Sequence, residues 1–154
     1  MLMQPRHYTE LFCLDEAVAL AAGHRPCALC QRAAFEAFRT AVSPQIRIRA
    51  TQLDAMLHRE RVARIRGHVS WNDTLGNLPD GSMVVLPDVP HQVWLKHRGF
   101  LLRWSHAGYE CAIPVSDEQI VEVLTPPTMR CALVAGYEPI LHLSVSHLCY
   151  PYTL

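Results

Sequence analysis

The residues with the clearest chemistry in this sequence are two cysteines, Cys27 and Cys30, which are separated by two residues. Pro26 directly precedes them, and proline suits the first position of a helix because its missing N–H would have no partner there. Two thiols three residues apart in a first helical turn lie on the same side, so both sulfurs can reach one metal ion. The unpaired N–H groups of a helix start also stabilise the thiolate that binds a metal. The pair therefore predicts half of a zinc site.

A structural zinc site has four protein ligands, so this pair needs two more. The sequence contains no second pair of cysteines with this spacing, and the upstream residues Cys13 and His7 are the ligands that we predict. Two other interpretations stay open for Cys27 and Cys30, namely ordinary reduced thiols and a redox-active dithiol. The redox interpretation has less support because the pair does not follow a strand of a βαβ unit. Further cysteines and histidines that could donate are His24, Cys111, Cys131, His142, His147 and Cys149.

The cysteine pair lies among residues 1–67, whose capping residues and apolar spacing are typical of helices. Asp15 is suited to cap a short helix that Gly23 ends. A second helix is predicted over residues 26–42, where apolar residues recur three and four apart. A third helix, with Thr51 as its cap, is predicted to end before Gly67. The part that contains the cysteine pair is therefore predicted to be helical.

After Gly67 the pattern changes to short segments that are typical of strands, and Thr125 is predicted to cap one late helix that Gly136 closes. The three residues 97–99, with glycine at their end, predict a hairpin. The predicted fold class is α+β, with a helical zinc-knuckle-like N-terminal half packed with a small antiparallel β-sheet. We place the boundary between residues 1–67 and 68–154, which form two halves of one domain or two small domains. The predicted strands cover residues 83–86, 92–96, 100–104 and 121–124.

The basic and acidic residues are unevenly distributed, although 14 of each give a net charge of zero. Residues 1–67 hold ten arginines and six carboxylates, a net charge of +4, and residues 68–154 hold four basic and eight acidic groups, a net charge of −4. The basic half can contact a polyanion such as nucleic acid, dock on the acidic half, or form a solvated helix face. A sequence pI near 7.1 lacks the strongly basic character of most nucleic-acid binders. The contacts that we predict for nucleic acid are Arg25, Arg59, Arg61, Arg64 and Arg66.

The segment from Leu14 to Cys30 resembles the end of the zinc-binding domain of Ada, the bacterial methyl-phosphotriester DNA repair protein. That family has a short helix rich in Glu and Ala, followed by Ala-Gly-aromatic-Arg-Pro-Cys and a second cysteine three residues later. The resemblance covers about twenty residues and implies that Cys27 and Cys30 are two of four zinc ligands. The nucleophile of Ada is one of two upstream cysteines, and this sequence has no matching upstream pair. The resemblance therefore does not extend to methyl transfer.

The chain also resembles a group of uncharacterised bacterial proteins. The shared segments are Tyr8-Thr9-Glu10-Leu11-Phe12, Leu14-Asp15-Glu16-Ala17, the segment around Cys27, and Leu124-Thr125-Pro126-Pro127. In that group additional sequence precedes these segments. The resemblance therefore implies that this chain lacks an N-terminal part.

Histidines near the predicted hairpin suggest a second kind of function. His91, His97 and His106 lie in or beside the predicted strands. Together with the tryptophans of the same half they could line a pocket. An enzyme would then use these histidines as acid or base in a pocket between the two halves. These histidines do not have the spacing of a catalytic metal motif such as His-x-His or HExxH. Solvated surface histidines are therefore the simpler interpretation.

We expect from these observations a metal-stabilised binding module, with zinc as its cofactor, and the sequence favours binding over catalysis. A third possibility is an oligomerising domain, because 50% hydrophobic and 18% charged residues leave apolar surface for a second copy. No apolar run approaches the roughly 18 residues of a membrane-spanning helix. The polar N-terminus, broken by Pro5, lacks a signal-peptide core. We therefore expect a cytoplasmic protein with reduced cysteines and no membrane partner.

Overall fold

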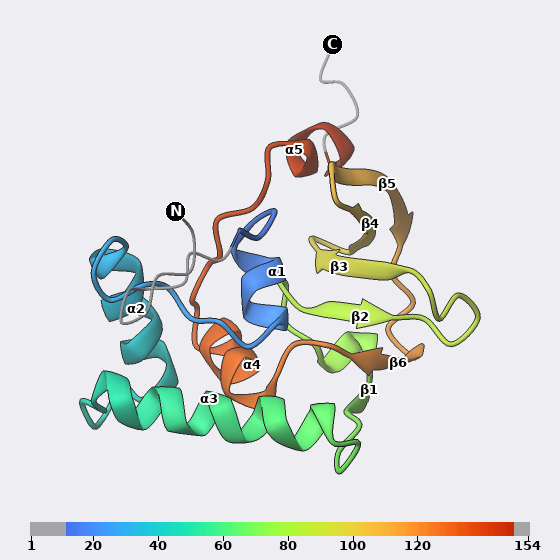
Figure 1. Cartoon of the computed structure of the whole chain (residues 1–154). Coiled ribbons are helices and arrows are strands. Elements are labelled where there is room, and N and C mark those ends of the chain that lie inside the picture. Colours follow the sequence, from blue (N-terminus) through green and yellow to red (C-terminus); the bar gives the residue numbers. More distant parts are fainter. Residues whose placement is uncertain (1–11, 150–154) are drawn as a thin grey trace, which may run out of the picture.

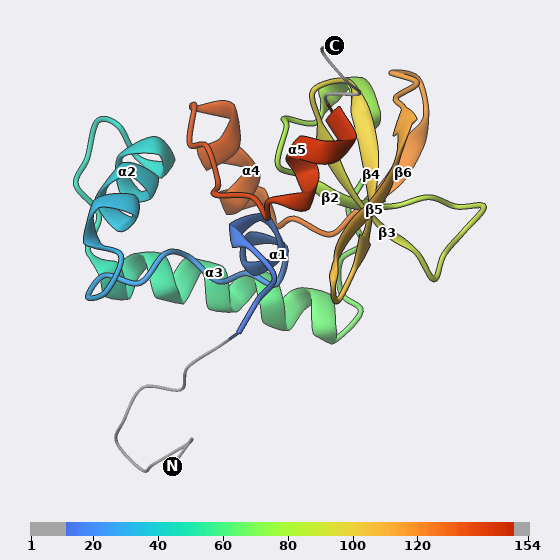
Figure 2. The same cartoon turned by 90° about the horizontal axis from the view of Figure 1, so that it is seen from above.

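The computed structural model describes residues 12–149, except for the side chain of Cys149, and shows the predicted α+β class. Helices gather at one side of the molecule and one antiparallel sheet lies at the other (Figure 1). In the view from above, α1 lies between α2 and the sheet, whereas α5 lies next to the sheet (Figure 2). The helices are α1 (Glu16–Ala21), α2 (Arg32–Val42), α3 (Ala50–Ile65), α4 (Pro127–Val134) and α5 (Ser144–Cys149), with a 3-10 turn η1 at Leu75–Asn77.

The sheet has six antiparallel strands in the order β1-β6-β2-β3-β4-β5, two more strands than the sequence predicts. The connection between β3 and β4 is two residues long instead of three, because His97 pairs with Phe100. Arg98 and Gly99 both have positive φ, +48° and +80°, which is the backbone of a type I′ turn. The strands are β1 (Asn72–Thr74), β2 (Met83–Val85), β3 (Val93–His97), β4 (Phe100–Ser105), β5 (Gly108–Pro114) and β6 (Ile120–Val123).

The start of α2 differs from the prediction. The helix begins at Arg32 and not at Pro26. Residues 27–31 form a separate turn, closed by the N–H of Gln31 donating to the carbonyl of Cys27 at 3.0 Å. Gln31 then leaves helical geometry with φ −124° and ψ 47° before α2 starts. The cysteine pair therefore lies in a turn that precedes the helix.

Two predicted caps are also different in the structure. Arg49 caps α3 in place of Thr51, and its N–H donates to the side chain of Gln52 at 2.9 Å. Pro126 is the N-cap of α4, while the hydroxyl of Thr125 accepts a bond from the N–H of Met83 at 2.8 Å. Thr125 thus joins the start of α4 to a strand. By contrast, the predicted cap of α1 is confirmed, since the carboxylate of Asp15 accepts from a helix N–H at 3.0 Å.

The core joins the two halves of the chain. Leu20 of α1 packs in one cluster with residues of α2, α3 and α4, so helices from before and after residue 67 share a core. Ala17, one turn earlier on α1, packs against strand residues such as Leu95 and against α5. The opposite face of the sheet, which includes Trp94, is covered by η1 and the segments around it. The described residues on the two sides of the predicted boundary, 12–67 and 68–149, therefore share one core.

Candidate functional site

The turn that carries Cys27 and Cys30 lies at the edge of the molecule, beside the first residue of α2 and away from the sheet (Figures 1 and 2). Cys30 is exposed and Cys27 is partly exposed. The chain enters this loop from α1 through Gly23, which has φ +78°. The site is therefore a short surface loop between α1 and α2.

Arg25 fastens the loop to α3. Its guanidinium donates two hydrogen bonds to the carboxylate of Asp54, at 2.7 and 2.9 Å, in a bidentate ion pair. The same guanidinium bonds the carbonyl of Pro26 at 2.9 Å and lies 4.7 Å from the centre of the Phe35 ring. The residue two positions before Cys27 is thus committed to contacts within the chain.

A second arginine holds the start of the loop. Arg61 of α3 donates a hydrogen bond to the carbonyl of Gly23. A Cβ atom at Gly23 would lie 2.7 Å from Cγ of Arg61, so glycine is required both by its backbone conformation and by this close approach. Burial, and then the charge of Arg61, lower the pKa of the adjacent His24. His24 is therefore neutral at neutral pH.

Replacing Gly23 by alanine is expected to lower the free energy of unfolding by about 2–3 kcal/mol, from left-handed strain and overpacking against Arg61. Gly67 provides the matched control, because it has φ +69° and no atom within 4 Å of an added Cβ. The variant Gly67→Ala should lose only about 1 kcal/mol. Urea unfolding followed by circular dichroism measures both. Equal losses would contradict the role given to Arg61.

Backbone N–H groups and a thiol surround the sulfur of Cys27. The backbone N–H groups of Cys30 and Leu29, the thiol of Cys30 and the positive charge of Arg25 all favour the charged form of this sulfur. These contacts stabilise the thiolate and lower the pKa of Cys27 to about 7. The pKa of Cys30 is raised, chiefly because its proton is shared with Cys27.

Alkylation of the metal-free protein by iodoacetamide is expected to be half-maximal for Cys27 near pH 7, because only the thiolate reacts. The rate should fall below this pH, where the sulfur is protonated. Cys13 is an internal control, since burial and the charge of Asp15 raise its pKa, so it should react only at higher pH. Peptide mass spectrometry at a series of pH values measures both. The same pH profile for the two cysteines would contradict this assignment.

A complete ligand set is not assembled around the pair within the described residues. Between residues 12 and 149, no group of three or more His, Cys, Asp or Glu side chains could hold a metal ion. Cys13 is exposed and does not join Cys27 and Cys30 in such a group. His7 lies outside the described residues. The assignment of Cys27, Cys30, Cys13 and His7 as zinc ligands therefore stays a prediction.

The arginines predicted to contact nucleic acid fall into two groups. Arg64 donates to the carbonyls of Val123 and Leu124, at 3.1 and 2.8 Å, and pairs with Glu122 at 3.1 Å. Arg25 and Arg61 bind groups within the chain in the same way, as described above. By contrast, Arg59 and Arg66 are exposed, and their guanidinium groups make no hydrogen bond or ion pair to residues 12–149. Of the five arginines predicted to contact nucleic acid, these two alone present a guanidinium that is unengaged within residues 12–149.

The histidines of the hairpin are not brought together as an acid–base pair. His97 pairs with the first residue of β4, whereas His106 follows the last residue of that strand and contacts the Trp104 ring edge to face, with 4.8 Å between ring centres. Burial is the main cause that lowers the pKa of His97. His91 is exposed before β3. Neither of the two cavities described next includes any of these three residues.

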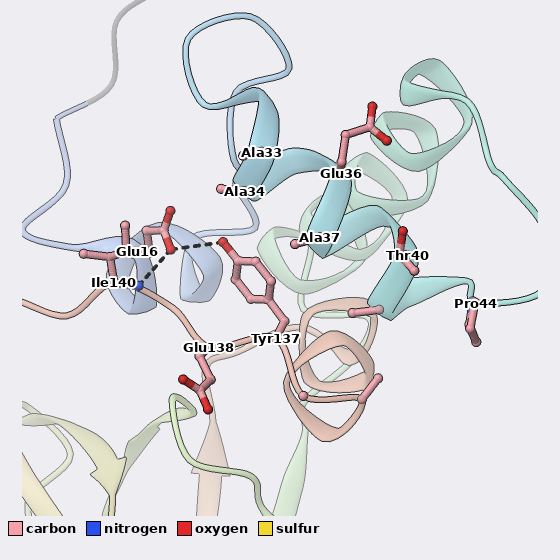
Figure 3. A pocket seen from close by; sticks show the side chains of 13 residues that line it. Glu16, Ala33, Ala34, Glu36, Ala37, Thr40, Pro44, Tyr137, Glu138 and Ile140 are labelled. Atoms are coloured by element: carbon pink, nitrogen blue, oxygen red, sulfur yellow. Dashed lines mark hydrogen bonds between the residues drawn. The ribbon is translucent and has the colours of Figure 1, made fainter.

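A cavity of about 760 Å³ lies between α2 and the segment that follows α4 (Figure 3). Alanines of α2, such as Ala37, line one wall. Glu16 lines another, where its carboxylate accepts from the Tyr137 hydroxyl at 3.0 Å and from the N–H of Ile140 at 2.8 Å. Sequence reasoning missed this cavity because alanines three and four apart on a helix are also typical of a packed face. It contains neither cysteine of the pair.

A smaller cavity of about 370 Å³ lies between α1, the end of α3 and the sheet. Apolar side chains, including Trp71, Met83 and Trp104, form most of its wall. Arg64 also lines it and lies over the Trp71 ring, 5.3 Å from the ring centre. Since this guanidinium already bonds carbonyls of the chain, it supports the cavity wall rather than offering a free charge to a ligand.

No protein-family model, curated protein or solved structure matches this chain. None of the helices in the described part of the chain has the length and apolar character needed to cross a membrane. The interpretation of the site thus depends on its own geometry.

Proposed function

We propose that the protein is a zinc-stabilised binding module in which Cys27 and Cys30 hold the ion as thiolates. The observation that carries this proposal is the turn of residues 27–31, which is closed by the N–H of Gln31 donating to the carbonyl of Cys27 and which leaves both thiols accessible. The backbone N–H groups of Cys30 and Leu29 help to lower the pKa of Cys27 to about 7. Hydrogen bonds of this kind favour the thiolate, which is the form that coordinates zinc.

The contacts that hold the turn in place also favour a metal site over two thiols without a function. Free cysteines without a role are typically buried and behave as small apolar residues. Here the pair is at the surface, and Gly23, Arg25 and Arg61 hold its loop against α3 through a bidentate ion pair and a carbonyl bond. A site built on a rigid support fixes its ligands more closely than a free loop. The loop is therefore suited to present both sulfurs in one orientation.

Zinc retention tests this proposal. The reduced protein, loaded with zinc and desalted, should keep zinc when measured by elemental analysis. The double variant Cys27→Ser/Cys30→Ser should lose it, because the hydroxyl is a far weaker zinc ligand than the thiolate. The matched control Cys111→Ser/Cys131→Ser removes two thiols that lie outside the turn and should keep its zinc.

Two outcomes would overturn the proposal. In the first, the protein keeps no zinc, and Cys27 and Cys30 form a disulfide in a glutathione redox buffer, which is the behaviour of a redox-active dithiol. In the second, the serine variant of the pair retains as much zinc as the original chain. Each outcome is read by elemental analysis combined with thiol counting.

The partner that we propose for the module is a polyanion such as nucleic acid, contacted by Arg59 and Arg66, whose guanidinium groups are unengaged within the described residues. Replacing both by glutamate should weaken nucleic-acid binding and reduce its dependence on salt concentration. The comparison is made by fluorescence anisotropy at several salt concentrations. If the original chain does not bind at low salt, this part of the proposal is wrong, while the zinc site is unaffected.

A further inference from the structure

We infer that the cavity between α1, the end of α3 and the sheet binds a small apolar carboxylate, whose charged group is held by Arg61. This inference goes beyond the zinc-stabilised binding module, because neither cysteine of the pair lines this cavity. The cavity volume of about 370 Å³ falls within the range of roughly 300–1,000 Å³ that is typical of small-molecule sites. The cavity is therefore large enough for a small organic ligand.

The wall of the cavity is mostly apolar and combines helices with the sheet. On the side of α1 it is formed by the modest side chains of Val18 and Ala21, which leave space next to the sheet. The sheet contributes larger side chains, among them Met83 of β2 and Trp104 of β4. Ile65 at the end of α3 also lines the cavity and is 84% exposed, so the cavity is open to solvent there. An apolar ligand can enter at this point and be removed from water.

The charged side chains that line the cavity are two arginines, Arg61 and Arg64, and no carboxylate of residues 12–149 lines it. Arg64 is already paired with Glu122 at 3.1 Å. Arg61 differs, because its Nη1 donates to the carbonyl of Gly23, which is a neutral group, and it forms no ion pair within the described residues. A partly buried charge is stabilised by an opposite charge. The cavity therefore favours an anion over a neutral or cationic ligand.

The geometry of the guanidinium suits a carboxylate in particular. The bond to Gly23 uses Nη1 of Arg61, while Nε and Nη2 donate to no group of residues 12–149. Two neighbouring N–H donors of an arginine match the two oxygens of one carboxylate. A single ligand group can therefore bind Arg61 without displacing its contact with the loop.

A second donor at the wall lacks an acceptor. The indole N–H of Trp104 is buried and makes no hydrogen bond within the described part of the chain. Buried polar groups are normally hydrogen-bonded, so this N–H is an exception that calls for an explanation. Hydrogen-bond donors are thus in excess at two residues of the wall. A ligand whose polar atoms are acceptors, as in a carboxylate, matches this wall best.

Isothermal titration calorimetry of the full chain tests the site with two probes, octanoate and 1-naphthoate. Both are apolar carboxylates, and they differ in whether the apolar part is a flexible chain or a flat ring system. We expect one molecule of at least one probe to bind per chain, and the tighter probe identifies the shape that fits. The corresponding alcohols, octanol and 1-naphthalenemethanol, should bind at least about tenfold more weakly, because they lack the charge that Arg61 binds.

The variant Arg61→Gln tests the charge at the protein. Glutamine keeps a donor for the carbonyl of Gly23 but has no positive charge, so we expect about tenfold weaker binding of the carboxylate. The matched control is Arg59→Gln, which removes an exposed charge from the same helix at a position outside the cavity wall. This control should bind the carboxylate as the original chain does.

A second pair of variants tests the place of binding. Ala22 lines the cavity from an exposed position at the C-cap of α1, so Ala22→Phe should fill the cavity and abolish binding. Ala135 is the exposed C-cap of α4 and is likewise followed by a glycine, but it does not line this cavity. The variant Ala135→Phe should therefore bind as before.

Several outcomes would overturn the inference. Neither carboxylate binds, or the alcohols bind as tightly as the carboxylates. Undiminished binding by Ala22→Phe, or by an Arg61→Gln variant that circular dichroism shows to be folded, would also contradict it. The comparison of carboxylates with alcohols uses the original chain, so the role of the charge is tested even if Arg61→Gln does not fold.

Discussion

Replacing Phe38 by alanine is expected to lower the free energy of unfolding by about 3–5 kcal/mol, the range typical of a large aromatic residue lost from a core. Phe38 of α2 has no exposed surface. Its ring meets the ring of Tyr137 edge to face, with 5.3 Å between centres, and it packs in the cluster shared by α1, α2, α3 and α4. Its loss would leave a cavity between the helices that support the cysteine turn. Urea unfolding followed by circular dichroism measures the loss.

Phe12 provides the control for this prediction. Its side chain is 85% exposed, so Phe12→Ala should change the free energy of unfolding by less than about 0.5 kcal/mol. Similar losses for the two variants would show that α2 is not held by this core. A loss at Phe38 of less than about 1 kcal/mol would show the same.

Replacing Asp15 by alanine is expected to lower the free energy of unfolding by about 3–4 kcal/mol, because one carboxylate serves three separate segments. It caps α1 by accepting from the N–H of Val18 at 3.0 Å. It also accepts from the hydroxyl of Tyr109 on β5 at 2.9 Å and from the N–H of His142 at 3.1 Å. Without the carboxylate, the buried Tyr109 hydroxyl would lose its acceptor. Thermal and urea unfolding measure the loss.

A double-mutant cycle isolates the contact between Asp15 and Tyr109. The variant Tyr109→Phe removes the stranded hydroxyl, so it should cost less in the Asp15→Ala background than in the original chain. Asp88→Ala is the control for the lost carboxylate, since Asp88 is exposed and makes no hydrogen bond or ion pair to residues 12–149. It should change stability by less than about 0.5 kcal/mol. Strict additivity of the two single variants would contradict the contact.

Features that depend on neighbours in the chain could be predicted from the sequence. The Asp15 cap, the end of α1 at Gly23 and the hairpin near Gly99 follow from capping and turn chemistry within a few residues. Short runs rich in residues that favour strands were sufficient to predict β2, β3, β4 and β6. The α+β class follows from these elements together. The spacing of Cys27 and Cys30 likewise made the pair the first candidate for a metal.

Other local features were decided by partners far away in the chain. Thr125 has the residue type of a cap, but its hydroxyl bonds the buried N–H of Met83, 42 residues earlier. β1 is short and polar and becomes a strand only by pairing with β6. The α2 start shifted because residues 27–31 closed into a turn of their own. Intrinsic preference is weak at such positions, so tertiary contacts override it.

The sequence alone made Cys27 and Cys30 the candidate metal ligands, because the type and spacing of these residues are local properties. The tertiary structure decided what surrounds them. Arg25, Arg61 and Arg64 resemble a polyanion-binding series in the sequence, yet they bind Asp54, the carbonyl of Gly23 and the end of β6. These partners lie 29 to 60 residues away, and sequence spacing gives no information on contacts at such separations. In the fold, Arg25 and Arg61 support the cysteine loop and Arg64 joins α3 to the end of β6, while their contact with nucleic acid stays a prediction.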